Sequence, residues 1–330
     1  MKKLLALVMA VAMTLSFASV AFAEYPDRDF NGTIMWGAGG VCDITSRAIT
    51  AYAEKAMGKT VVMTNRPGGG GAVSTAYVNE QPADGYELLF GAENPQIAKI
   101  MGTSELDYDD FTPITIFCTS VAVCVVNKDS KYDTFEQLIE DMKGGDLLQG
   151  ATGQGGLPYT VAALVKSING CEGNQIVYDG EGPACNALMG GEVDYVFTTL
   201  GSAMKFIQSG DLKCLTVFAK ETVPGLEEVR LVTDIYPAYN DVLPWGPFYG
   251  VFVKNGTDAA QVEYLTKIFA EAASNEEFQQ LLLGYGCVPA CMTGEAARAY
   301  LDSYKATTSY LIYDAGGAVN NPADLGIVRP

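Results

Sequence analysis

Short apolar runs alternate with amphipathic segments along most of this chain, and this alternation restricts the possible folds more than any other feature. In the first part of the sequence it predicts strands at 33–37, 59–65 and 86–92, and helices at 43–58 and 72–79. Strands separated by helices in this way form a largely parallel sheet with helices packed on its faces. The predicted fold class is therefore α/β.

A second series of strands and helices follows the apolar run at 121–128. Its predicted strands are 147–152, 174–180, 193–200 and 213–219, and its predicted helices are 134–143, 159–169, 182–191 and a segment ending at Gln208. After a further apolar run at 247–254, helices are predicted at 259–283 and 294–310. The runs at 121–128 and 247–254 therefore mark the entrance to and the exit from a second lobe, and two crossover strands form a hinge. The predicted lobes are 24–120 plus 249–330, and 121–248.

The first 23 residues have the features of a secretory signal peptide. Lys2 and Lys3 precede an apolar run from 4 to 20, and Ala21-Phe22-Ala23 is a typical cleavage site. No cysteine at that point could accept a lipid, so a free periplasmic protein is expected. The roughly 300 residues that remain exceed the size at which a single core usually divides, which agrees with two lobes.

The formal net charge of -18 and the absence of histidine exclude several function classes. Nucleic acids and anionic membranes bind basic surfaces, so neither is an expected partner. Without imidazole or a C-x-x-C pair, no metal site is expected. Ser-His and Cys-His pairs are absent too, and Ser202-Ala203-Met204-Lys205 matches the S-x-x-K nucleophile motif by chance, since no K-T-G is present. We expect no enzyme activity and no cofactor.

Eight cysteines in an exported chain could form disulfides. Cys171 and Cys185 flank a predicted strand, and Cys287 and Cys291 bracket a Val-Pro-Ala turn, so these are the two candidate bridges. Cys214 lies inside an apolar run and is expected to be a buried thiol. The sequence leaves the connectivity open.

Two glycine-rich loops stand where a predicted strand leads into a predicted helix. Residues 36–43 read WGAGGVCD, and residues 151–160 read ATGQGGLPYT. In an open parallel sheet, ligands bind beyond the carboxyl ends of the strands, and a helix start with accessible backbone N–H groups attracts anions. Such loops could hold a carboxylate without arginine. The alternative is structural: the glycines make tight turns, and Asp43 caps its helix.

Several motifs follow in a fixed order along the mature chain. Tyr25-Pro26 opens it, 38–43 fits P-G-G-x-x-D, 65–71 fits N-R-P-G-x-G-G, 82–86 fits P-x-D-G-Y, and 178–194 fits Y-x-G-x-x-P-A-x-x-x-L-x-G-G-x-V-D. With these motifs the chain resembles the substrate-binding proteins of tripartite tricarboxylate transporters, also called Bug receptors. The resemblance covers nearly all of the mature chain.

This resemblance implies a two-lobed periplasmic binding protein fold in which facing loops hold a carboxylate through backbone groups and ordered waters. It also implies delivery of that solute to the membrane subunits of such a transporter, by a protein expected to be a monomer. A ligand-sensing protein that signals to a membrane partner is the alternative. The expected ligand-binding residues are Trp36, Gly37, Ala38, Gly39, Gly40, Asp43, Asn94, Thr152, Gly153, Gln154, Gly155, Gly156, Tyr178, Thr198 and Thr199.

The sequence departs from the family pattern inside the expected pocket. Gly37 and Ala38 stand where prolines are usual, Asp179 stands where lysine is frequent, and Thr198 stands where aspartate is frequent. These changes alter the pocket beyond the anion-binding loops. The family resemblance therefore does not determine which carboxylate is bound.

Asp43 could decide whether the solute is a plain organic acid or an amino acid. A carboxylate beside a bound anion is repulsive unless a positive group lies between them, and the ammonium of an amino acid would provide that group. Asp179 and Glu181 add negative charge to the second lobe and favour the same reading. If Asp43 is only a helix cap, it does not select between the two classes of solute, and its replacement by asparagine should have little effect on binding or stability.

Overall fold

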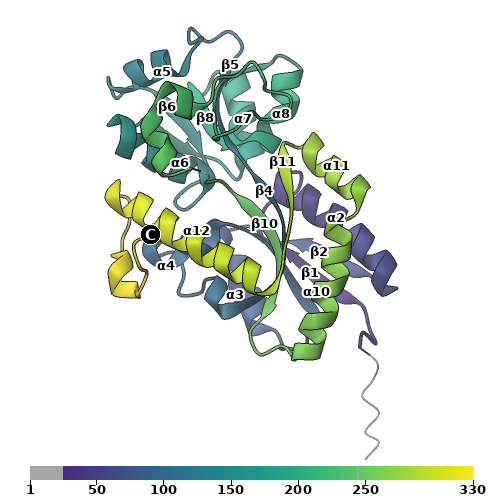
Figure 1. Ribbon diagram of the computed structural model, residues 1–330. Helices are drawn as coiled ribbons and strands as arrows, with labels where there is room; N and C mark the ends of the chain where they lie inside the picture. Colours follow the sequence, from purple (N-terminus) through teal and green to yellow (C-terminus); the bar gives the residue numbers. More distant parts are fainter. Residues whose placement is uncertain (1–24, 244) are drawn as a thin grey trace, which may run out of the picture.

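The computed structural model describes residues 25–243 and 245–330, which form two β-sheets with helices on the faces of each (Figure 1). The predicted signal peptide lies outside these residues. The first sheet has six strands in the order β11-β4-β10-β3-β1-β2. Its strands are β1 (Phe30–Ile34), β2 (Val61–Asn65), β3 (Glu87–Ala92), β4 (Phe111–Ser120), β10 (Phe248–Lys254) and β11 (Cys287–Met292).

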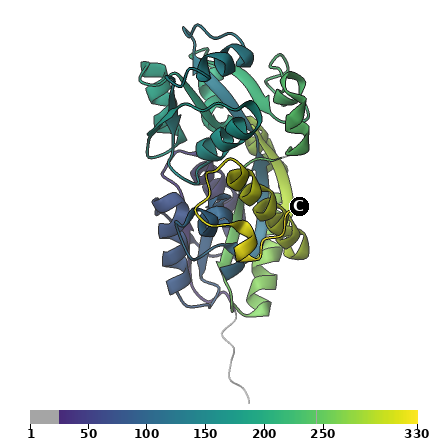
Figure 2. The ribbon, with the colours of Figure 1, turned by 90° about the vertical axis from the view of Figure 1, so that its left-hand side faces the viewer.

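The second sheet has five strands in the order β7-β6-β8-β5-β9. Its strands are β5 (Ala122–Asn127), β6 (Leu148–Ala151), β7 (Asn174–Val177), β8 (Tyr195–Thr199) and β9 (Leu212–Phe218). Both views of the molecule show this sheet and its helices stacked above the first (Figure 2). The α/β fold class and the two-lobed architecture predicted from the sequence are confirmed.

Helices cover the sheets. The helices that pack around the first sheet are α2 (Val41–Met57), α3 (Ala72–Glu80), α4 (Ala98–Met101), α10 (Ala259–Ala273), α11 (Glu276–Gly284) and α12 (Gly294–Asp314). The helices of the second sheet are α5 (Phe135–Met142), α6 (Leu157–Asn169), α7 (Glu181–Gly190), α8 (Leu200–Gln208) and α9 (Val232–Ile235). Short 3-10 turns include η2 (Asn94–Ile97) and η3 (Tyr108–Asp110). No helix in the described ranges is both long and apolar enough to cross a bilayer.

Parallel pairing occurs where the sequence shows strand–helix–strand order, and antiparallel pairing where the chain crosses between the sheets. β1 pairs parallel with β2 and β3, and β6 pairs parallel with β7 and β8. β4 leads into β5 through Val121, and β10 returns the chain to the first sheet, where it runs antiparallel to β3 and β4. Two crossings therefore connect the sheets, close to the predicted runs at 121–128 and 247–254.

Several predicted element boundaries were wrong. β1 ends at Ile34, so Trp36 and Gly37 lie in the loop beyond it, and α2 begins at Val41 instead of at Asp43. The predicted helix at 259–283 is two helices, because Asn275 caps a new helix start by accepting a hydrogen bond from the Phe278 N–H at 3.1 Å. β4 and β11 were not predicted.

All eight cysteines are free thiols, so both predicted disulfides are wrong. Cys287 and Cys291 lie in the extended strand β11, where residues four apart are roughly 13 Å from each other, too far for a disulfide. Cys171 and Cys185 belong to different apolar clusters. Cys214 is a half-buried thiol, and burial raises its pKa to about 12.

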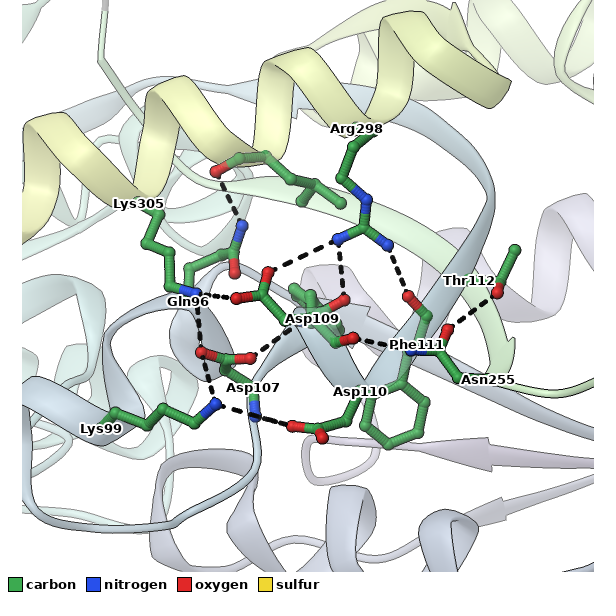
Figure 3. Close-up of polar contacts among 12 residues, drawn as sticks. Gln96, Lys99, Asp107, Asp109, Asp110, Phe111, Thr112, Asn255, Arg298 and Lys305 are labelled. Carbon is green, nitrogen blue, oxygen red and sulfur yellow. Dashed lines mark hydrogen bonds and ion pairs between the residues drawn. The ribbon is translucent and has the colours of Figure 1, made fainter. Parts of the chain in front are cut away.

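A cluster of charged side chains ties α12 to the segment that precedes β4 (Figure 3). Lys305 of α12 lies 2.7 Å from the fully buried Asp107 carboxylate and 2.6 Å from Asp109. Lys99 lies 3.2 Å from Asp107 on the other side. Arg298 donates to the carbonyl oxygens of residues 108 and 111 at 2.9 and 2.6 Å. These contacts fix the C-terminal helix to the first sheet's half of the molecule.

Replacing Asp107 by asparagine should lower the free energy of unfolding by about 3 kcal/mol, because Lys99 and Lys305 then lose the buried carboxylate that compensates their positive charges. The η3 turn should survive, since asparagine caps as well as aspartate. Urea unfolding measures the change. The matched control is Asp129→Asn, which breaks an exposed pair with Lys128 and should change stability by less than about 0.5 kcal/mol. Equal effects of the two variants would contradict a stabilising role for the cluster.

Candidate functional site

A cavity of about 480 Å³ lies between the two sheets. Most of its lining residues follow the carboxyl ends of the parallel strands β1, β3, β6, β7 and β8 or belong to the helices that begin there. This is where a doubly wound sheet places its ligands, because the loops there lead into helix starts. Of the residues predicted to bind ligand, those that line it are Trp36, Gly37, Ala38, Gly39, Gly40, Thr152 and Thr199.

Three helices begin at this cavity without a side-chain cap. The N-cap residues of α2, α6 and α7 are Gly40, Gly156 and Gly180, and none has a side chain to bond the first backbone N–H groups. The cavity is lined by Gly40, Gly180 and the first residue of α6. Each helix start carries about half a positive charge together with donors that its own helix does not use. The arrangement is suited to hold an anionic group.

The loop before α2 is fixed in its conformation by neighbouring groups. Gly39 has φ of 82°, which glycine adopts readily and residues with a side chain rarely do. The Asn65 side chain donates to the Trp36 carbonyl oxygen at 2.7 Å. Gly40 itself has φ of -79° and ψ of 168° and is extended. The loop therefore presents the start of α2 to the cavity in a defined geometry.

Asp43 supports this loop from behind and does not line the cavity. Its carboxylate accepts hydrogen bonds from the Gly39 N–H at 2.9 Å, from Asn65 at 2.9 Å and from Arg47 at 2.7 Å. Burial acts to raise the pKa of Asp43, but these bonds outweigh it and lower the pKa below its ordinary value. The alternative reading of Asp43 as the N-cap is wrong, because α2 begins at Val41 and Gly40 holds that position.

Asp43→Asn should weaken solute binding by about tenfold and lower stability by about 2 kcal/mol, since the amide has one oxygen for three donors and no charge for Arg47. The loss should be the same for amino acids and for the matching deaminated acids, because Asp43 acts through the loop. Isothermal titration calorimetry and urea unfolding measure both effects. A loss confined to amino acids would instead make Asp43 a ligand contact.

The second glycine-rich loop meets the first sheet beside the cavity. Thr152 lines the cavity, whereas Gly153, Gln154, Gly155 and Gly156 do not. The Gly155 carbonyl oxygen accepts a hydrogen bond from the Asn94 side chain, across the boundary between the sheets. Asn94 is thus placed between the two halves of the molecule and not in the cavity lining.

The remaining predicted residues, Tyr178, Thr198 and Thr199, lie on the side of the cavity formed by the second sheet and its helices. Thr198 is buried and donates to the Glu181 carboxylate at 2.9 Å. Thr199 caps α8 and bonds the same carboxylate through its N–H at 3.0 Å. Tyr178 lies outside the lining and donates to Glu192 at 3.4 Å. Glu181 therefore fixes the start of α8, which forms part of the cavity wall.

Sequence reasoning missed several polar residues of the lining. Glu93 and Tyr249 come from the first sheet's half, and Ser202 and Lys205 come from α8. Ser202 and Lys205 form the S-x-x-K match, and in the described part of the chain Lys205 is the one basic residue of the lining. The position of Glu93 directly after a buried strand was the signal that could have identified it. Residues 25–243 and 245–330 contain no cluster of potential metal ligands.

Known proteins resemble this chain over most of its length. The family described as "Tripartite tricarboxylate transporter family receptor" matches residues 45–315. Protein BugT of Bordetella pertussis (strain Tohama I) is 25% identical over 311 residues, which cover 91% of this chain and 94% of that protein. The structure of the periplasmic binding protein BugD superposes with a TM-score of 0.82 at 24% identity, covering 89% and 99% of the two chains.

A further solved structure extends the comparison to a complex with a bound acid. The structure of MatC from Rhodopseudomonas palustris with bound malate superposes with a TM-score of 0.79 at 21% identity. The match covers 88% of this chain and 100% of MatC. At this identity the likeness concerns the fold. It shows that the two-sheet arrangement described above is shared with proteins of this kind over nearly their full length.

Proposed function

The chain belongs to the family of tripartite tricarboxylate transporter receptors, which are binding proteins and not enzymes, and we propose that it captures a small carboxylate in the cavity between its sheets. It then delivers that solute to the membrane subunits of a tripartite transporter, from the periplasm and as a monomer. The observation that carries the proposal is the meeting of three uncapped helix starts on one cavity.

The proposed contacts follow from the lining. The backbone N–H groups at the starts of α2 and α7 bind the carboxylate, with Gly40 on one side and Gly180 on the other. Lys205 and Ser202 extend the site on the α8 side. Structures of similar proteins solved with malate and with adipate support a carboxylate as the class of solute.

A thermal-shift screen tests the proposal. The purified mature chain is heated with mono-, di- and tricarboxylates, aromatic acids and acidic amino acids, with matched neutral alcohols and sugars as controls. A solute at about 100 times its dissociation constant stabilises the native state by about 2.7 kcal/mol, which a melting curve detects readily. Stabilisation by at least one acid and by no neutral compound is expected. Stabilisation by the neutral compounds alone would contradict the proposal.

The cavity closes around the solute by rotation of two lobes, 24–120 with 249–330 and 121–248, about the crossing segments. Hinge closure is a common response of two-lobed periplasmic receptors. Opening of the lobes would break the hydrogen bond from Asn94 to Gly155, which joins them. Small-angle scattering should give a larger radius of gyration without solute than with a saturating acid. An identical radius in both conditions would mean a rigid cavity.

A further inference from the structure

Glu93 is a buried carboxyl group on the wall of the cavity, and no other described residue forms a hydrogen bond or an ion pair with it. It follows β3, is 5% exposed and lines the cavity. Among residues 25–243 and 245–330, the hydrogen bond to its carboxylate comes from its own backbone N–H. None of the described ion pairs reaches it, although a buried carboxylate is costly without a cation or several donors.

Among the described residues, the groups that act on the charge of Glu93 do not include a cation. The titratable groups near it come from α2, η3, α7, β10 and α12, and each is either neutral or negative. They are Cys42, Tyr108, Glu181, Tyr249, Tyr300 and Tyr304. Burial, and then the charge of Glu181, raise the pKa of Glu93 to about 8. A cation brought into the cavity would remove this cost.

The cavity as a whole is acidic on its side-chain surface. Glu93, Asp179 and Glu181 line it, against Lys205 as the single basic residue of the described lining. Glu181 bonds Thr198 and Thr199 through one oxygen, Oε2, so its other oxygen lies outside these bonds. The backbone N–H groups at the helix starts attract a negative group, whereas the acidic side chains attract a positive one.

We infer that the solute is a zwitterion, an amino acid or a similar amino-carboxylate, whose ammonium group binds Glu93 while its carboxylate binds the helix starts. The inference rests on the proposed function, since it assumes the carboxylate site. A second carboxylate of a plain diacid at this position would face three acidic side chains. An ammonium group instead finds acceptors in Glu93 and in the free oxygen of Glu181.

Calorimetric titration of matched pairs tests this inference. The probes are L-glutamate against glutarate, L-aspartate against succinate, and L-phenylalanine against 3-phenylpropanoate, with wild-type protein and Glu93→Gln at pH 8. Wild type should bind at least one amino acid at least tenfold more tightly than its deaminated partner. In Glu93→Gln that amino acid should lose about 100-fold in affinity, and the deaminated acid should change by less than threefold.

Glu263→Gln is the matched control, an exposed glutamate of α10 outside the cavity, and it should behave as wild type. Circular dichroism verifies that Glu93→Gln is folded. Tighter binding of the deaminated acids by wild type, or equal losses for both members of a pair in Glu93→Gln, would overturn the inference while leaving the carboxylate receptor intact. If no member of any pair binds, and no acid in the screen binds either, the proposed function is rejected and the inference with it.

Discussion

Replacing Gly40 by valine should weaken binding of the solute by about 100-fold without unfolding the protein. A valine side chain at this N-cap would cover the backbone donors at the start of α2. Loss of two hydrogen bonds to a charged group corresponds to about 3 kcal/mol, which is roughly 100-fold in affinity. Calorimetric titration with the tightest acid found by thermal shift measures the loss.

The structure indicates that this variant can fold. Gly40 has an extended conformation open to any residue, and an added Cβ would have its nearest contact at 3.7 Å. Gly190→Val is the matched control, because Gly190 at the end of α7 also has an ordinary conformation and a nearest contact at 3.8 Å. It lies outside the cavity lining and should bind normally. Undiminished affinity in Gly40→Val would remove the first loop from the site.

The stability of the solute-free protein should fall between pH 5 and pH 8 because of Glu93. Its pKa is raised to about 8 in the native state by burial, whereas in the unfolded chain it titrates near its ordinary value. Across this window the native state therefore keeps a proton that the unfolded state has lost, so rising pH favours unfolding. The stability is fully present below the unfolded-state pKa and is lost as pH rises through the native one.

Glu93→Gln removes this dependence, since its amide does not titrate. Relative to the variant, wild type should lose on the order of 3 kcal/mol of unfolding free energy between the two pH values, at about 1.4 kcal/mol per pKa unit. Urea unfolding of both proteins at pH 5 and pH 8 measures the difference. Parallel changes in the two proteins would show that Glu93 is ionised in the native state at both pH values.

The alternation of apolar and amphipathic segments predicted most of the elements because local periodicity reflects which face of each element is buried. It failed at β11, where Pro289 and the flanking cysteines resemble a turn although the segment pairs with β4. It also missed β4, whose pairing depends on β10 and β11 from the distant C-terminal part of the chain. Tertiary contacts of this kind leave little trace in local sequence.

The same limit applies to the site. The rule that ligands bind at strand carboxyl ends pointed to the loop at 36–40, because the succession of strand, loop and helix along the chain can be read from the sequence. It could not decide which nearby carboxylate faces the cavity. Asp43 turns toward Arg47 and Asn65, whereas Glu93 lines the cavity and bonds no other residue of the described ranges. That difference depends on side chains brought together by folding.

The most direct measurement of the central claim compares one acid with its own primary amide, in which a carboxylate is replaced by an uncharged group. The tightest-binding acid from the thermal-shift screen and its primary amide are titrated into the protein under the same conditions by calorimetry. Because three uncapped helix starts face the cavity, the account predicts that the amide binds at least 100-fold more weakly than the acid. Equal affinity of the acid and the amide would contradict it.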